Sequence, residues 1–85
     1  MEVLMSKKFK KLFKKCPAEI KIKFKEKLKL FVIDKYSPIL NNHPLHGRFD
    51  DCSSINITGD YRAVFEEYPE YVIFIDIGNH SRLYK

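Results

Sequence analysis

Apolar residues recur at helical spacing through the first 35 residues of the chain, and lysines occupy most positions between them. Ser6 is of a type preferred as a helix N-cap, while Pro17 ends one helix and suits the first turn of the next. The spacing predicts two successive amphipathic helices that form a hairpin. Their apolar stripes are Phe9, Leu12, Phe13 and Cys16 in the first helix, and Ile20, Phe24, Leu28, Phe31 and Val32 in the second.

Strand-like runs precede and follow these helices. We expect a short first strand at Glu2–Met5, and three later runs separated by the turns Thr58-Gly59 and Glu67–Glu70. The last run is apolar on both faces apart from Asp76, which is typical of a central strand covered on both sides. The three later runs are Arg48–Cys52 continuing into Ser53–Ile57, Tyr61–Glu66, and Tyr71–Ile77.

This order of elements predicts an α+β fold in a single domain of residues 1–85, with the helix hairpin packed on a small twisted antiparallel sheet. No apolar run approaches the roughly 20 residues needed to cross a bilayer. The first residues lack the apolar core of a secretory signal. We therefore expect a cytoplasmic protein in which Cys16 and Cys52 are reduced thiols. A basic helix pair lying on a membrane is a weaker alternative, because the small core needs the apolar stripes.

Charge is spread unevenly along the chain. Residues 1–35 hold twelve lysines and four acids, a balance of +8, whereas residues 36–85 hold four basic residues and seven acids, a balance of −3, so the total is +5. A polyanion partner bound by the basic half would account for this asymmetry. Ordinary solvation of lysine-rich helix surfaces would account for it equally well.

Groups able to bind phosphate and move protons stand at the ends of two strand runs. Antiparallel pairing through the Glu67–Glu70 turn places Asp60 across from about Ile77, with His80 just past the same end of the sheet. Arg62 shares a strand face with Asp60, since side chains alternate with period two. A carboxylate and an imidazole suit general acid–base catalysis, and a guanidinium suits phosphate. This set favours RNA cleavage by a 2′-hydroxyl, which needs no metal or other cofactor.

Each candidate also has a structural interpretation. Asp60 after Gly59 is typical of a turn, and His80 could be a solvated loop residue. His43 and His46 lie on a loop that this argument does not place, and together with Cys52 they are weak support for zinc, because no second paired motif accompanies them. We expect no metal site, and we expect His46 to take no part in catalysis.

Three motifs at these positions resemble the toxins of the RelE/ParE superfamily, nearest its YafQ-like branch. They follow a lysine-rich helix hairpin and are Asn42–Gly47, Ser54–Arg62 and Gly78–Tyr84. The resemblance implies a toxin of a type II toxin–antitoxin module that cuts mRNA in the ribosomal A site. It also implies a cognate antitoxin as partner.

By the resemblance, His43, Asp60 and His80 match the family's proton-transfer groups, and Arg62 matches an arginine that binds phosphate. Tyr84 matches an aromatic residue that stacks on the substrate, and Tyr61 replaces a tryptophan. Asn56 and Asp76 depart from the branch, which carries a histidine and an arginine there. The residues expected to bind RNA are Tyr61, Tyr84, Arg82, Lys7, Lys8 and Lys11.

Two other functions remain open. ParE-like members of the superfamily inhibit DNA gyrase without cutting RNA, although such a surface has no special need of His43 and His80. Alternatively, the changes at Asn56 and Asp76 leave a module that binds nucleic acid without cleaving it.

Overall fold

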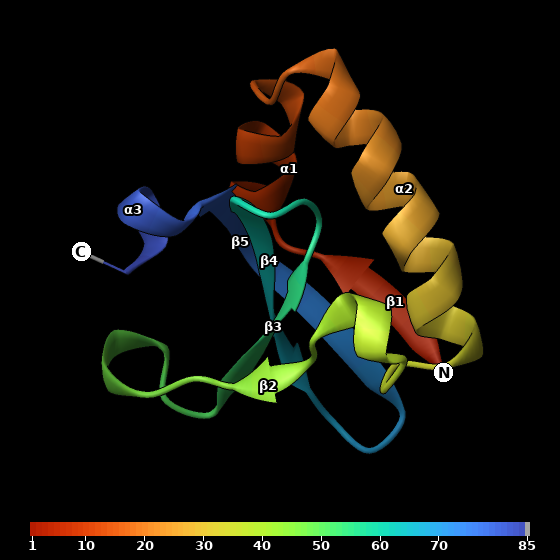
Figure 1. The fold of residues 1–85 in the computed structure, drawn as a ribbon. Coiled ribbons are helices and arrows are strands. Elements are labelled where there is room, and N and C mark those ends of the chain that lie inside the picture. Colours follow the sequence, from red (N-terminus) through yellow and green to blue (C-terminus); the bar gives the residue numbers. More distant parts are fainter. Residues whose placement is uncertain (85) are drawn as a thin grey trace.

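The computed structural model describes residues 1–84, which fold into a helix layer on a single sheet (Figure 1). The predicted α+β class is confirmed. The helices are α1 (Lys7–Lys14), α2 (Ala18–Ile33) and α3 (His80–Leu83), with 3-10 turns η1 (Pro38–Leu40) and η2 (Gly47–Phe49). The strands are β1 (Glu2–Met5), β2 (His43–Pro44), β3 (Cys52–Asn56), β4 (Tyr61–Glu67) and β5 (Tyr71–Asn79).

The two predicted helices form as their caps and apolar stripes indicate. The Ser6 side chain caps α1 by accepting a hydrogen bond from the Phe9 amide at 3.0 Å. Pro17 separates α1 from α2 and is the N-cap residue of α2. Val32 was predicted in the core stripe but is 55 % exposed. Each helical residue turns about 100° from the last, so the residue after the fully buried Phe31 faces away from the sheet.

The sheet has the strand order β1-β5-β4-β3-β2. β5 is an inner strand, as its apolar run predicted, and pairs antiparallel with β4 and parallel with β1. The sheet is therefore mixed rather than wholly antiparallel. The sequence indicated that Glu2–Met5 is a strand, but the direction of its pairing with Tyr71–Phe74 depends on a long-range contact.

Phenylalanines join the helices to the sheet. The Phe74 ring on β5 lies 5.4 to 5.8 Å, centroid to centroid, from four other rings, and all five side chains are at most 1 % exposed. Aromatic pairs at this spacing contribute roughly 0.5–1.5 kcal/mol each beyond the area they bury. The partners of Phe74 are Phe9, Phe24, Phe31 and Phe65. This core holds the sheet rigidly against α1 and α2.

The segment predicted as a strand at Arg48–Cys52 is mostly a turn. It contains η2, followed by Asp51 with a φ of 69°, and β3 begins only at Cys52. The positive φ at Asp51 bends the chain before it enters the sheet. Before this turn, β2 adds a two-residue edge strand that the sequence did not predict.

Candidate functional site

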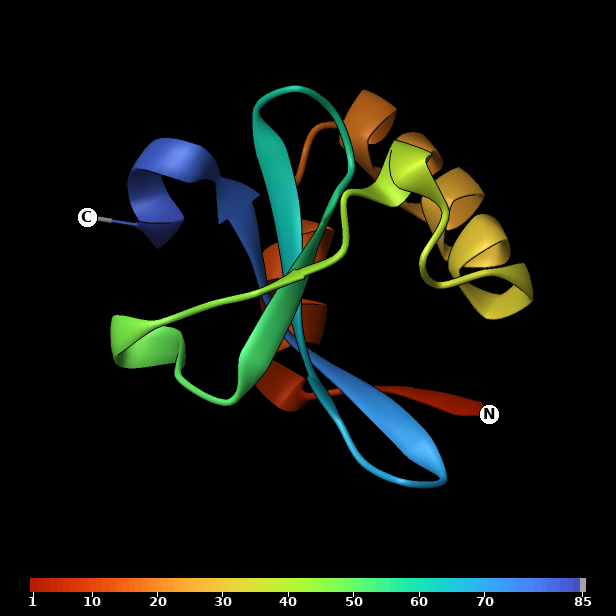
Figure 2. The same ribbon diagram turned by 60° about the horizontal axis from the view of Figure 1, so that its bottom comes forward.

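The sheet face opposite α1 and α2 is covered by a smaller group of side chains, which we call the second cluster. Its buried members are Leu45, Phe49, Cys52, Val64 and Leu83. They come from the η2 region, β3, β4 and α3, and both views place η2 and α3 away from α2 (Figure 2). Residues alternating with these along the strands face α1 and α2. Neither α1 nor α2 covers this second face, so polar side chains at the ends of its strands can reach solvent there.

Asp60 and His80 are neighbours at one end of this sheet. The His80 amide donates to the Asp60 carbonyl oxygen at 3.0 Å, and both side chains are exposed. The prediction that Asp60 lies across from Ile77 is wrong, because Ile77 pairs with Ala63. The β4–β5 hairpin closes tightly through the Tyr68 amide and Tyr71 carbonyl at 2.8 Å, and a bulge after Val64 shifts the register further.

Arg62 fastens the loop that carries Asp60. Its Nη1 donates to the carbonyl oxygens of Thr58 and Gly59 at 3.1 and 3.0 Å, and also to that of Tyr61 at 3.3 Å. Arg62 follows the same alternation as Val64, so it lies on the second face. Within residues 1–84 the hydrogen bonds of the guanidinium are all made by Nη1, and the residue is half-buried.

His80 opens α3 and is backed by an aromatic ring. The Tyr84 ring lies 4.7 Å from the His80 ring at an interplanar angle of 63° and packs on the second cluster, with its centroid 6.3 Å from that of Phe49. Leu83, between them in sequence, is fully buried. The imidazole is thus exposed on one side and supported on the other.

His43 lies in β2, opposite Ser54 of β3. Its Nδ1 is 2.7 Å from the Asn41 carbonyl oxygen, which can only accept a hydrogen bond, so we assign the proton to Nδ1. This tautomer leaves Nε2 as a proton acceptor. β2 is three strand spacings from β5, or about 14 Å along the sheet, and two from β4, or about 10 Å. His43 is therefore farther from the β5 end that carries His80 than from the strand that carries Arg62.

Tyr61 does not share a face with Tyr84. Tyr61 packs against the core beneath α1 and α2, whereas Tyr84 packs on the second cluster. The two residues were predicted to stack on the same RNA. Since neighbouring strand residues point to opposite faces, Tyr61 cannot share the side of its neighbour Arg62.

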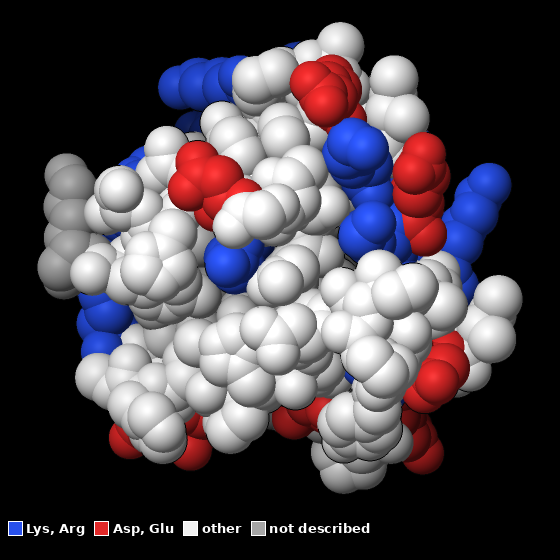
Figure 3. Space-filling view, viewed as in Figure 1, with Lys and Arg blue, Asp and Glu red and all other residues white. Residues whose placement is uncertain are grey.

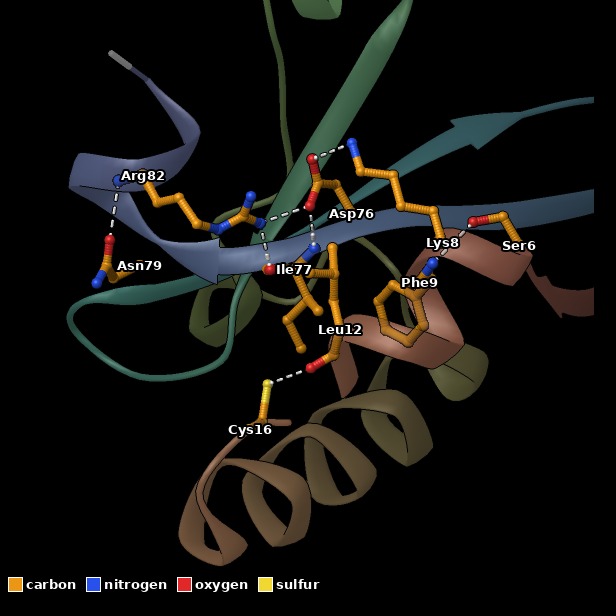
Figure 4. A network of polar contacts seen from close by, with 9 residues as sticks. All are labelled: Ser6, Lys8, Phe9, Leu12, Cys16, Asp76, Ile77, Asn79 and Arg82. Carbon is orange, nitrogen blue, oxygen red and sulfur yellow. Dashed lines mark hydrogen bonds and ion pairs between the residues drawn. The ribbon is translucent and has the colours of Figure 1, made fainter. Parts of the chain in front are cut away.

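Asp76 binds two of the predicted RNA-binding cations (Figure 4). Its carboxylate is 1 % exposed and accepts from Arg82 Nη2 at 2.6 Å, from Lys8 Nζ at 3.1 Å and from the Ile77 amide at 2.8 Å. Burial would raise the pKa of Asp76, but the hydrogen bonds from Arg82 and Lys8 outweigh it and hold the pKa below its ordinary value. Lys8 and Arg82 are therefore not free cations, while Lys7 and Lys11 are exposed.

Three buried polar atoms lack a hydrogen-bond partner within residues 1–84, and sequence reasoning did not single them out as a group. They are Ser54 Oγ, Asn56 Oδ1 and Tyr84 Oη. Ser54 and Asn56 alternate with core residues along β3 and so lie on the second face, where Tyr84 also packs. Buried polar atoms are nearly always paired in native proteins, so this face has unused capacity for hydrogen bonds.

The two thiols are far from one another in the packing. Cys16 contacts the core beneath the helices and Cys52 belongs to the second cluster, and burial raises the pKa of both.

Within residues 1–84 there is no group of three or more His, Cys, Asp or Glu side chains placed to hold a metal ion. In the same span, no helix has the length and apolar character required to cross a membrane.

No protein-family model matches the chain, and no curated protein sequence matches it either. Solved structures do match over nearly the whole length. A mutant of YafQ from E. coli superposes with a TM-score of 0.79 at 17% identity, covering 99% of this chain and 98% of that one. The YoeB/ParE toxin from Agrobacterium tumefaciens gives 0.75 at 15% identity, with coverage of 94% and 99%.

The E. coli DinJ-YafQ complex gives a TM-score of 0.76 at 17% identity, covering 99% of this chain and 98% of that one. At these identities the likeness concerns the fold. The chain therefore has the fold of the RelE/ParE-superfamily toxins YafQ and YoeB, as the three sequence motifs predicted.

Proposed function

We propose that the chain is the toxin of a type II toxin–antitoxin module and cuts mRNA on the ribosome. The observation that carries the proposal is the meeting of Asp60 and His80 at one sheet end, beside the loop held by Arg62. The fold shared with YafQ and YoeB adds support. Ribosomes as the target imply that the protein acts in the cytoplasm.

In the proposed reaction a 2′-hydroxyl of the RNA attacks the adjacent phosphorus, and the bond to the 5′-oxygen breaks. One side chain must take the hydroxyl proton and another must protonate the leaving oxygen. We assign these transfers to His80 and Asp60, whose backbones are hydrogen-bonded to each other. The guanidinium of Arg62 would neutralise the phosphate, and Tyr84 would stack on a base. The protons balance without a metal or another cofactor.

His43 has a different place in this proposal. Its free Nε2 can accept a proton or a hydrogen bond, but β2 is about 14 Å from β5 along the sheet. A single phosphate could not contact both His80 and His43 across this distance, but an RNA strand with a neighbouring nucleotide could. We therefore propose that His43 contacts the nucleotide next to the cleaved bond.

A cognate antitoxin is the second partner that we propose. DinJ-YafQ and the YoeB-YefM complex from Staphylococcus aureus are solved pairs with this toxin fold. In the view of Figure 3, Lys and Arg side chains lie mainly over the upper and left parts of the molecule, and acids lie both among them and along the lower rim. A groove is lined by apolar residues, among them Phe9 and Phe13, and by four lysines, with no acidic residue. An acidic, amphipathic partner segment fits this positive charge and apolar lining.

The test is induction of the protein in bacteria followed by mapping of message ends by primer extension. We expect discrete cuts that disappear in His80→Ala. His46→Ala is the matched control, because His46 is an exposed histidine of the loop with no assigned role. Cuts that persist in His80→Ala would exclude the assigned mechanism. DNA damage with intact messages would instead identify a gyrase inhibitor, and RNA binding without cuts would identify a non-cleaving module.

A further inference from the structure

α3 is too short to hold its own shape. It has four residues, whereas isolated helices of fewer than about 12 residues are marginal in water. Its position must therefore come from contacts with the rest of the molecule. Leu83 supplies one such contact, since it is fully buried in the second cluster. His80 is the first residue of this short helix and Tyr84 follows its last, so whatever fixes α3 also fixes the candidate catalytic imidazole.

Arg82 supplies a second and more directional contact. Besides binding Asp76, its Nη2 donates to the Ile77 carbonyl oxygen at 2.5 Å, and its backbone amide donates to Asn79 Oδ1 at 2.8 Å (Figure 4). The guanidinium lies directly over Gly78, where an added Cβ would come within 2.5 Å of Nε. Arg82 is thus held by its backbone amide at one end and by its guanidinium at the other, and its side chain packs against β5.

The other end of this contact is rigid. Asp76 is 1 % exposed, sits in the inner strand β5, and is also bound by Lys8 from α1. A buried carboxylate is stable only when its partners remain in place, because breaking one leaves a desolvated charge. Asp76 therefore ties α3 to the part of the molecule fixed by the phenylalanine core.

We propose that Asp76 and Arg82 are positioning residues, which hold α3 so that the His80 imidazole and the Tyr84 ring keep a fixed place at the sheet end. The role in catalysis rests on the proposed function, but the anchoring itself does not. In this proposal Asp76 serves to anchor α3, and the guanidinium of Arg82 binds Asp76 rather than RNA.

A matched pair of variants tests the anchoring without reference to activity. Arg82→Met and Lys8→Met each remove one cation from the same carboxylate, but only the first cuts the tie to α3. We expect amide hydrogen exchange at position 82 and at Tyr84 to accelerate by about 10- to 100-fold in Arg82→Met, in line with the loss of charge-assisted hydrogen bonds. In Lys8→Met the rates at these amides should change less than threefold, roughly the scatter of context effects. Equal rates in the two variants would overturn the proposal.

Gly78→Ala tests the same contact while leaving every charge in place. The new Cβ would displace the guanidinium, so exchange in α3 should rise as in Arg82→Met. Gly59→Ala is the control, because an added Cβ there meets nothing within 4 Å. Exchange in α3 that is the same for the two alanine variants would overturn the proposal.

Activity then separates positioning from direct RNA contact. Displacing a catalytic group by about 1 Å can cost 10²-fold, so Gly78→Ala should lower kcat by about 10- to 100-fold with little change in KM. If Arg82 instead bound RNA, Asp76→Ala would release its guanidinium from the carboxylate, RNA binding would improve and KM would fall. A lower KM in Asp76→Ala with unchanged kcat would overturn the positioning role. If the wild-type protein cuts no RNA, the proposed function fails, and the exchange experiments alone decide the anchoring.

Discussion

Replacing Ser54 by alanine should stabilise the protein, contrary to the usual effect of a core substitution. Ser54 is 0 % exposed, and its Oγ has no hydrogen-bond partner within residues 1–84. Leaving a buried hydroxyl unpaired costs about 1–3 kcal/mol. Alanine removes that cost and loses only one atom of packing. We therefore expect the free energy of unfolding to rise by about 1 kcal/mol.

Urea unfolding followed by circular dichroism measures this change. A gain of about 1 kcal/mol with an m-value of about 2 kcal/mol/M raises the midpoint by about 0.5 M, and it raises Tm by about 4–8 °C. Ser53→Ala is the control, because Ser53 is the next residue of β3, is half-buried and faces the other side of the sheet. Its effect should stay within about 0.5 kcal/mol. A loss of about 1 kcal/mol or more in Ser54→Ala would show that the hydroxyl is paired and would refute the reasoning.

Three further predictions follow from the site. His80→Gln should slow cleavage by about 10²- to 10⁴-fold in single-turnover assays on ribosomes, because we propose His80 as a proton-transfer group. Tm should show no loss, because the side chain is exposed. Because its pKa is lower when folded than unfolded, Asp76 stabilises the protein above about pH 4 and loses this effect as the pH falls further. Urea midpoints between pH 2 and 6 should therefore decline more steeply in the wild type than in Asp76→Asn, and parallel curves would contradict this. Lys7→Ala combined with Lys11→Ala should reduce the slope of log affinity for RNA against log salt by about 0.7 for each lost phosphate contact, and an unchanged slope would remove both lysines from the interface.

Local patterns in the sequence were sufficient to predict most of the helices and strands. Apolar residues at helical spacing, such as Phe9 and Phe24, predicted the helices, because a helix buried on one face repeats about every 3.6 residues. The continuous apolar run around Phe74 predicted an inner strand, because both faces of such a strand are covered. The pairing of β1 with β5 depends on a contact about 70 residues apart and leaves no local signal. The turn at η2 was missed because Phe49 and Cys52 are apolar, and their burial by a loop looks the same in sequence as burial by a strand.

The candidate site was predictable only in part. The sequence was enough to bring Asp60 to the same sheet end as His80, since both follow from one hairpin. The bulge after Val64 was not predictable, and a shift of this kind decides which residues face each other. Asp76 stood out as the only charge in an apolar run. Its partner Arg82 could not be identified, because the contact depends on how the chain turns from β5 into α3.

The capped edge of β5 limits how this protein can associate. β1 pairs with β5 only as far as Phe74, so a sheet border would lie open beyond that point. There the Ile77 amide is occupied by Asp76 and the Ile77 carbonyl by Arg82, which leaves an incoming strand no backbone groups to bind at that residue. At the opposite border, β2 is two residues long and one of them is Pro44. Pairing with a further strand is therefore discouraged at both borders of the sheet.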